Sequence, residues 1–221
     1  MSSRIQMASR RQFLRNAAFG TAVFTTPGLF AEQLARTPRV AEGPFYPDKL
    51  PLDTDNDLLI INDALTPAVG QVSHLHGTVR DIKGNLLRNA LVEIWQVDGK
   101  GVYLHSDAPK EDQDRNFQGY GRFSTDAQGR YYFRTVKPVA YPGRTPHIHL
   151  AVSQKGKRML TTQCYIQGEP RNGKDFLYKR LGAERQKLVT LPFEELEGSR
   201  TAELQARWDL VVGVTPEDRR R

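Results

Sequence analysis

Residues 130–166 read RYYFRTVKPVAYPGRTPHIHLAVSQKGKRMLTTQCYI, and this stretch decides the fold. It contains three runs rich in aromatic and β-branched residues, at 130–136, 148–152 and 158–166. Such runs favour β-strands. Pro142-Gly143 forms a turn signal ahead of the second run. The stretch therefore predicts consecutive strands joined by turns.

Similar short runs continue on both sides of this stretch. Further strands are expected at residues 72–79 and 90–97, with a closing one at 207–214, and residues 123–125 precede a turn at 126–129. Residues 106–121 are polar and predict a long loop beside a site, and residues 182–189 predict a surface helical turn. Many short strands with Gly, Asn and Asp turns predict an all-β fold, an antiparallel β-sandwich with long connecting loops and little helix.

The composition narrows the possible functions. The 221 residues carry a formal net charge of +7, but four arginines before Glu32 account for much of it, and removing them leaves +3. Nucleic-acid binding is therefore not implied. Cys164 is the only cysteine, which excludes an internal disulfide and a zinc site built from several thiolates.

The first residues read as a leader rather than as part of the fold. Ser9-Arg10-Arg11-Gln12-Phe13-Leu14, followed by a modestly apolar run to Phe24, resembles a bacterial twin-arginine export signal. The alternative is a basic amphipathic helix at a membrane surface. Because the apolar run is too short to span a bilayer, we expect no stable membrane insertion after export. The prediction is a signal peptide over residues 1–31, cleaved after Ala31, one domain over residues 32–221, and a periplasmic or secreted product.

A cluster of metal-binding side chains lies within residues 141–149. His147 and His149 are two apart on an expected strand, so both imidazoles share one face and can reach one point. The turn after Tyr141 can direct its phenol toward that point, and Arg144 lies between them. The alternative is one structural and one solvated histidine. The adjacent tyrosine and arginine favour a metal site.

Nine motifs together resemble the intradiol ring-cleavage dioxygenases, and among them the iron-bearing subunit of protocatechuate 3,4-dioxygenase. The likeness runs from Glu42 to Gly213. Each motif alone is weak, whereas their joint order is specific. They are Glu42-Gly43-Pro44, Asp55-Asn56-Asp57-Leu58, residues 76–81, residues 90–96, Gly101-Val102-Tyr103, residues 132–138, Tyr141-Pro142, residues 146–149 and residues 163–168.

The resemblance implies a metal centre and a reaction. Ferric iron, Fe(3+), would be held by Tyr103, Tyr141, His147 and His149, and phenolate oxygen is a hard anionic donor suited to a trivalent metal. Zinc sites prefer Cys, His and carboxylate, and ferrous oxygenases use two His and one carboxylate. The implied reaction is cleavage of a catechol-type ring between its two hydroxyls with O2, which gives a cis,cis-muconate-type product.

The resemblance also implies roles around the iron. Tyr141 leaves the metal when the catechol binds and accepts a substrate proton, Arg144 stabilises negative charge on the ring, and Gln163 lies near the pocket. Trp95 is either a site neighbour or a plain core aromatic. Gly143 stands where protocatechuate enzymes carry tryptophan, and the segment before His147 is shorter, so the ring preference stays open.

Other candidates have simpler explanations. His74 and His76 form a second H-x-H pair that we interpret as structural, and His105 as a loop residue. Tyr46 is expected to pack in a loop, with substrate contact as the alternative, and Cys164 to be a small buried hydrophobe, with a place near the pocket as the alternative.

Tyr165 has two readings of equal weight, core packing or a hydrogen bond near the iron. For the whole chain, the alternative functions are an exported non-catalytic β-sandwich binding module and a phenol-binding copper or zinc protein. The expected partners are a small catecholic substrate and O2, with a homo-oligomer or a related subunit as possible protein partners.

Overall fold

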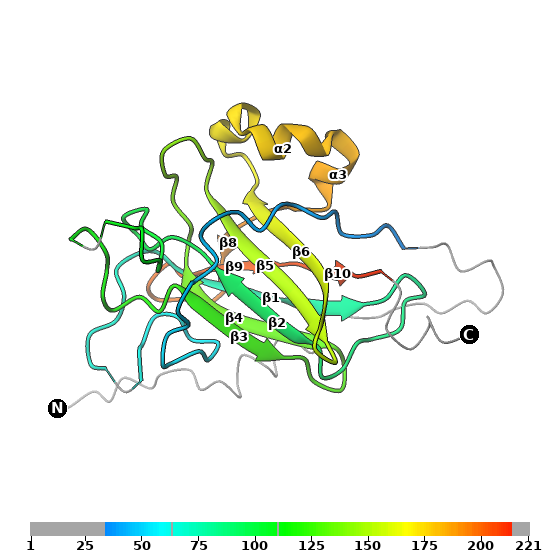
Figure 1. Cartoon of the computed structure of the whole chain (residues 1–221), viewed down its shortest axis with the longest axis horizontal. Helices are drawn as coiled ribbons and strands as arrows, with labels where there is room; N and C mark the ends of the chain where they lie inside the picture. Colours follow the sequence, from blue (N-terminus) through cyan, green and yellow to red (C-terminus); the bar gives the residue numbers. More distant parts are fainter. Residues whose placement is uncertain (1–33, 63, 110, 214–221) are drawn as a thin grey trace. The chain divides into compact units, whose positions relative to one another are not determined.

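The computed structural model describes residues 34–62, 64–109 and 111–213, which form a β-sandwich of two sheets (Figure 1). The strands are β1 (Val72–Arg80), β2 (Leu91–Trp95), β3 (Tyr120–Ser124), β4 (Arg130–Val136), β5 (His147–Gln154), β6 (Lys157–Ile166), β7 (Thr190–Leu191), β8 (Glu194–Glu195), β9 (Leu204–Arg207) and β10 (Leu210–Val211). The helices are short: η2 (Pro170–Lys174), α2 (Phe176–Leu181) and α3 (Ala183–Lys187). The predicted fold class is confirmed.

Both sheets mix antiparallel and parallel pairs. One has the order β3-β2-β5-β6-β7, and in the other β1 pairs with β4 on one side and with β9 and β10 on the other, with β8 beside β9. The pairs β1–β9, β1–β10 and β6–β7 are parallel. The late strands return to earlier ones after long connections, which is the condition for parallel pairing.

The expected closing strand is divided in two. Residues 204–207 and 210–211 pair with β1 in one continuous register, and Trp208 and Asp209 interrupt it. A carboxylate oxygen of Asp209 accepts hydrogen bonds from the backbone N–H and the hydroxyl of Thr78, both at 2.9 Å. This side-chain acceptor takes the place of a backbone ladder bond, so the single strand predicted over 207–214 is wrong in its extent.

Two other predicted segments differ in extent. The loop expected over residues 106–121 ends before Tyr120, because Tyr120 and Gly121 already pair with Trp95 and Ile94 of β2. The helical turn expected over 182–189 is α3, and α2 precedes it, capped by the side chain of Asp175. In Figure 1, α2 and α3 lie together at one end of the strands.

The alternation of β5 separates the core from the site. Ile148, Leu150 and Val152 are fully buried in the main core between the sheets. His147 and His149 project to the opposite face, because successive side chains on a strand alternate. That outer face is covered by a second aromatic cluster of Trp95, Tyr103 and Tyr120, with Phe45, Tyr46, Val139 and Tyr141 packed against it.

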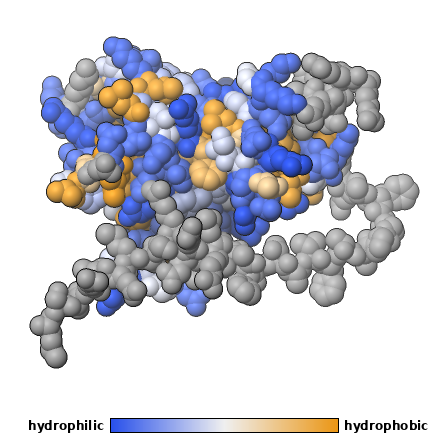
Figure 2. All heavy atoms as spheres, turned by 90° about the horizontal axis from the view of Figure 1, so that it is seen from below, coloured by the Kyte–Doolittle hydropathy of each residue, from blue (hydrophilic) through white to orange (hydrophobic). Residues whose placement is uncertain are grey.

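Residues 37–40, which lead toward Phe45 and Tyr46 of the second aromatic cluster, run beside β6 and β10. The backbone N–H of Val40 donates to the carbonyl of Thr161 at 3.0 Å, and the N–H of Thr37 donates to Val211. On the face shown in Figure 2, hydrophobic residues form separate patches among hydrophilic ones. No helix in the described ranges is both long and apolar enough to cross a bilayer.

Candidate metal centre

Two imidazoles of β5 meet a phenol from the loop after β2. The Nε2 atoms of His147 and His149 are 3.1 Å apart. The Tyr103 hydroxyl lies 3.3 Å from Nε2 of His147 and 3.0 Å from Nε2 of His149. All three side chains are buried. The structure therefore brings together three of the four residues predicted as ligands.

The tautomer of His147 leaves a lone pair on Nε2, the nitrogen that faces His149 and Tyr103. Nδ1 lies 2.7 Å from the carbonyl oxygen of Thr145. A carbonyl only accepts, so Nδ1 carries the hydrogen, and Nε2 of the neutral ring carries a lone pair. Burial, with a smaller contribution from the Arg144 charge, lowers the pKa of His147 to about 4, which keeps the ring neutral at pH 7.

The ring of His149 is held by stacking. Trp95 lies parallel to it, with centroids 4.8 Å apart and an interplanar angle of 11°. Within the described ranges its buried Nδ1 has no hydrogen-bond partner. Burial and the neighbouring His147 hold the pKa of His149 well below its usual value. Of the two readings of Trp95, the structure supports packing against the site.

Tyr103 is fixed from outside by Phe45, whose ring stacks on it with centroids 4.8 Å apart. Burial, followed by the nearby Tyr141, raises the pKa of Tyr103 well above that of a free phenol. Ionisation of this phenol therefore needs a cation beside it, and a bound metal ion supplies one.

Tyr141 lies at the edge of the cluster in the turn expected at Pro142-Gly143. Its carbonyl accepts the N–H of Arg144 at 3.0 Å, and Gly143 has φ +82°, a value that favours glycine. The ring lies 5.3 Å from Tyr103 and 5.7 Å from His147 between centroids. Tyr141 is half-buried whereas Tyr103 is buried. The two phenols therefore differ in their access to solvent.

The donor atoms fit a single ion. Donors that each lie about 2.1 Å from one ion are about 3.0 to 3.4 Å apart for angles between octahedral and tetrahedral. The three separations between Tyr103, His147 and His149 are 3.0, 3.1 and 3.3 Å. In the described part of the chain, no three His, Cys, Asp or Glu side chains gather as a metal site. A metal here would bind to imidazole and phenol.

Arg144 joins this cluster to a buried network. Its Nη1 lies 3.4 Å from the hydroxyl of Tyr141, Nη2 donates to Oε1 of Gln163 at 2.7 Å, and Nε donates to Oδ2 of Asp175 at 2.7 Å. The hydroxyl of Tyr165 also donates to Gln163, at 2.9 Å. Arg144 therefore lies beside Tyr141 and Gln163 beside Arg144, and Tyr165 hydrogen-bonds to Gln163 near the cluster. Sequence reasoning missed Asp175.

The remaining candidates lie apart from the cluster or support it. His74 bonds to the Tyr132 hydroxyl at 2.6 Å and to a Glu203 carboxylate oxygen at 2.7 Å, as a structural histidine does. Tyr46 donates to Glu93 at 2.7 Å. Cys164 is buried in the main core.

His105 lies in the loop after β2, with its ring nearly perpendicular to that of Phe45 and the centroids 5.8 Å apart. Tyr46 also packs edge-on against Trp95, with centroids 5.0 Å apart, so it supports the wall of the site.

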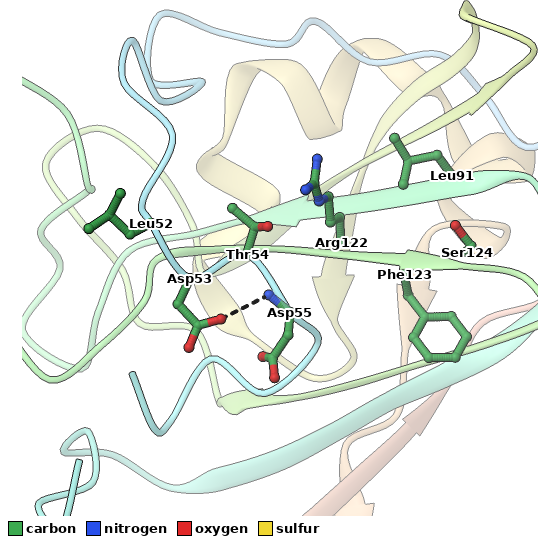
Figure 3. Close-up of a pocket in the computed structure, with 8 residues that line it drawn as sticks. All are labelled: Leu52, Asp53, Thr54, Asp55, Leu91, Arg122, Phe123 and Ser124. Atoms are coloured by element: carbon green, nitrogen blue, oxygen red, sulfur yellow. Dashed lines mark hydrogen bonds between the residues drawn. The ribbon is translucent and has the colours of Figure 1, made fainter. Parts of the chain in front are cut away.

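A separate surface pocket lies at β3 (Figure 3). Its acidic side chains are used to shape the loop: Asp53 accepts the backbone N–H groups of Asp55 and Asn62, and Asp55 accepts that of Asp57. None of the predicted site residues lines it. The lining residues are Leu52, Asp53, Thr54, Asp55, Leu91, Arg122, Phe123 and Ser124.

Comparison with known proteins identifies the family. A family model described as dioxygenase (Dioxygenase_C) matches residues 41–213. The chain belongs to the intradiol dioxygenase family. It is 36% identical to catechol 1,2-dioxygenase of Acinetobacter baylyi over 171 residues, 69% of this chain and 52% of that protein. It is 46% identical to the protocatechuate 3,4-dioxygenase beta chain of Burkholderia cepacia over 107 residues, 42% of this chain and 44% of that one.

Solved structures share the fold. The dioxygenase domain of a dioxygenase carbohydrate-binding protein fusion from the cellulolytic bacterium Streptomyces sp. SirexAA-E is 28% identical, with a TM-score of 0.63, over 82% of this chain and 100% of that one. This chain spans about half the length of the curated relatives it matches. The predicted family is confirmed; the predicted leader over residues 1–31 lies outside the described residues and stays a prediction, as does the domain boundary after it.

Proposed function

We propose that the protein is a non-haem Fe(3+) dioxygenase that cleaves a catechol-type ring between its two hydroxyls. Both atoms of O2 enter the product, a cis,cis-muconate-type diacid. The observation that carries this proposal is the meeting of the Tyr103 hydroxyl with the Nε2 atoms of His147 and His149, within 3.0 to 3.3 Å of one another in a buried site. Phenolate oxygen favours a trivalent metal, and the names of the relatives, catechol and protocatechuate dioxygenases, point to the same substrate class.

In this proposal Tyr103, Tyr141, His147 and His149 hold the iron, which when bound supplies a Lewis acid that draws electron density from the catecholate ring. The two imidazoles stay neutral, because burial lowers the pKa of both rings. Because Phe45 stacks on its ring, Tyr103 would be the phenol that keeps its position.

Tyr141 is the phenol suited to exchange. It is half-buried, and its hydroxyl faces the guanidinium of Arg144 at 3.4 Å. A phenolate at this position could take a proton from a catechol hydroxyl, and the nearby positive charge would stabilise that phenolate beforehand. Tyr141 therefore acts as the base, and Arg144 then faces the ring on which negative charge develops.

Gln163 limits the freedom of that arginine. Its Oε1 accepts from Arg144 and from Tyr165, and its Nε2 donates to the carbonyl of Ala41 at 2.9 Å. With its amide held at both ends, Gln163 offers Arg144 a fixed acceptor. Its role is to keep the charge beside Tyr141 rather than to transfer a proton.

Oxygen uptake with a panel of catechols, followed by mass analysis of the products, tests the proposal. The expected product contains two added oxygen atoms and two carboxylates, and the loaded protein is red-brown from phenolate-to-iron charge transfer. A colourless, fully metallated protein would refute the iron assignment and support the zinc alternative, and metal analysis would separate a coloured copper protein from an iron protein. A coloured protein that consumes no O2 with any catechol would support the binding module.

We also propose that the protein acts outside the cytoplasm, exported by the twin-arginine route. The supporting feature is the Arg10-Arg11 pair before Phe13-Leu14. Replacing both arginines with lysine should retain the protein in the cytoplasm, and fractionation of cells measures this. Equal export of the double variant would refute the route. Light scattering of the exported protein tests for a homo-oligomer.

A further inference from the structure

A carboxylate that the sequence did not indicate lies at the junction of two elements. Asp175 precedes α2, and its side chain has no exposed surface. Oδ1 accepts the backbone N–H groups of Leu177 and Tyr178, both at 3.0 Å. Oδ2 accepts Nε of Arg144 at 2.7 Å and the backbone N–H of Thr145 at 3.1 Å. Only the first oxygen caps the helix, so the second is available to the turn that carries Arg144.

The contact with Oδ2 sets the direction of the guanidinium. The guanidinium group is planar, so fixing Nε and Nη2 also fixes the direction of Nη1. Asp175 holds Nε, and Gln163 holds Nη2 at 2.7 Å. Nη1 is thereby turned to the hydroxyl of Tyr141 at 3.4 Å. The ring of Phe176 lies 5.8 Å from Cζ of Arg144 and limits its movement on the outer side.

The same oxygen reaches the imidazole pair through the backbone of one residue, Thr145. The N–H of Thr145 binds to Asp175, and the carbonyl of Thr145 accepts Nδ1 of His147 at 2.7 Å. The Thr145 hydroxyl donates to Asn172 at 2.8 Å. The position of that carbonyl decides which nitrogen of His147 carries the hydrogen. Asp175 therefore stabilises the backbone that selects the tautomer.

We propose that Asp175 is a positioning residue that directs the Arg144 guanidinium toward Tyr141 and, through Thr145, holds His147 in the tautomer with a free Nε2. The catalytic consequence rests on the proposed function, whereas the two orientations do not. A plain helix cap would need only Oδ1. The buried charge is matched by one guanidinium and three backbone donors, which meets the requirement that a buried ion be paired and hydrogen-bonded.

The test is Asp175→Asn in the full chain without metal, labelled with ¹⁵N. Asparagine keeps the shape and a capping oxygen, but its amide NH₂ takes the position of Oδ2. There it faces Nε of Arg144 and the N–H of Thr145, which are both donors and lose their acceptor. We expect the Arg144 Nε–H resonance to shift and exchange at least tenfold faster, the Thr145 amide to lose protection, and the ¹⁵N pattern of His147 to show a mixture of tautomers. Unchanged signals at all three positions would overturn the proposal.

The matched control is Asp126→Asn. Asp126 also receives Nε of its arginine, Arg130, at 2.7 Å, and accepts two backbone N–H groups, but in an exposed turn. This variant should leave the signals of Arg144 and His147 unchanged. If both variants change them equally, the effect is a general one of charge, and the positioning role is refuted.

Two further measurements separate positioning from stability and from function. If Asp175→Asn does not fold, Asp175→Ser keeps a capping oxygen without the second acceptor and must show the same three changes. In the iron-loaded protein, kcat should fall about 10- to 100-fold, as for other residues that orient metal ligands, with a smaller change in KM. If wild type cleaves no catechol, the proposed function fails, while the resonance spectra still decide the role of Asp175.

Discussion

The metal-free protein should lose stability in acid because of one buried imidazole. His147 is enclosed, and its pKa in the folded state is about 4, compared with 6.5 for an ordinary histidine. Below pH 6.5 the unfolded chain binds a proton that the folded chain cannot bind until the pH approaches 4. The stability is therefore fully present above pH 6.5 and falls between pH 6.5 and 4.

The size of the effect follows from the difference in pKa. Each unit corresponds to about 1.4 kcal/mol, so His147 alone should lower the free energy of unfolding by about 3 kcal/mol between pH 7 and 4. His149, whose pKa is lowered by burial and by His147, acts in the same direction. Bound iron should oppose the loss, because a ligating nitrogen must first release the metal before it accepts a proton.

Denaturant unfolding at several pH values measures this. The wild type should lose about 3 kcal/mol more than His147→Gln, which cannot titrate, over the same pH range. The comparison uses the pH dependence of each protein, so a uniform destabilisation of the variant does not affect it. Parallel curves for the two proteins would refute the reasoning, and so would a loss of stability that begins only below pH 4.

Three further predictions concern single residues. Tyr141→Phe should retain iron but slow substrate deprotonation by about 100-fold, measured in single-turnover kinetics; unchanged turnover would remove its role as base. His147→Ala should abolish metal binding, whereas His74→Ala should not, and metal analysis that finds equal content in both variants contradicts the assigned ligands. Gly77→Ala should cost more than about 4 kcal/mol in denaturant unfolding, because the added Cβ would collide with the carbonyl of Trp208, and a stability near that of wild type would show that the strands can separate there.

Much of the sandwich could be predicted because the information is local. The alternating sequence of residues 72–79, the spacing of His147 and His149 and the turn at Pro142-Gly143 are visible within a few residues. The division between β9 and β10 could not be predicted in this way. It depends on a contact between Asp209 and Thr78, 131 positions apart in the chain. Periodicity contains no information about such a partner.

The same distinction applies to the site. The pair of imidazoles follows from the period of one strand, and Tyr103 came only from the family resemblance. Asp175 was missed because no helix was predicted after it, and because its second oxygen meets Arg144 from 31 positions away. Phe45 was missed because two rings that stack from distant parts of the chain have no characteristic spacing in the sequence.

The imidazole pair belongs to β5, the middle strand of its sheet, whereas Tyr103 and Tyr141 belong to loops. Half of the centre is thus anchored on a strand that is hydrogen-bonded on both sides, and half on loops, which tolerate insertion and replacement. A Cβ added at Gly143 meets no atom within 4 Å, but its φ of +82° strains most other residues, so changes in this turn would alter the surroundings of Tyr141 while β5 keeps the spacing of the two nitrogens. In the proposed function, the strand would hold the metal ion and the loops would select the aromatic ring.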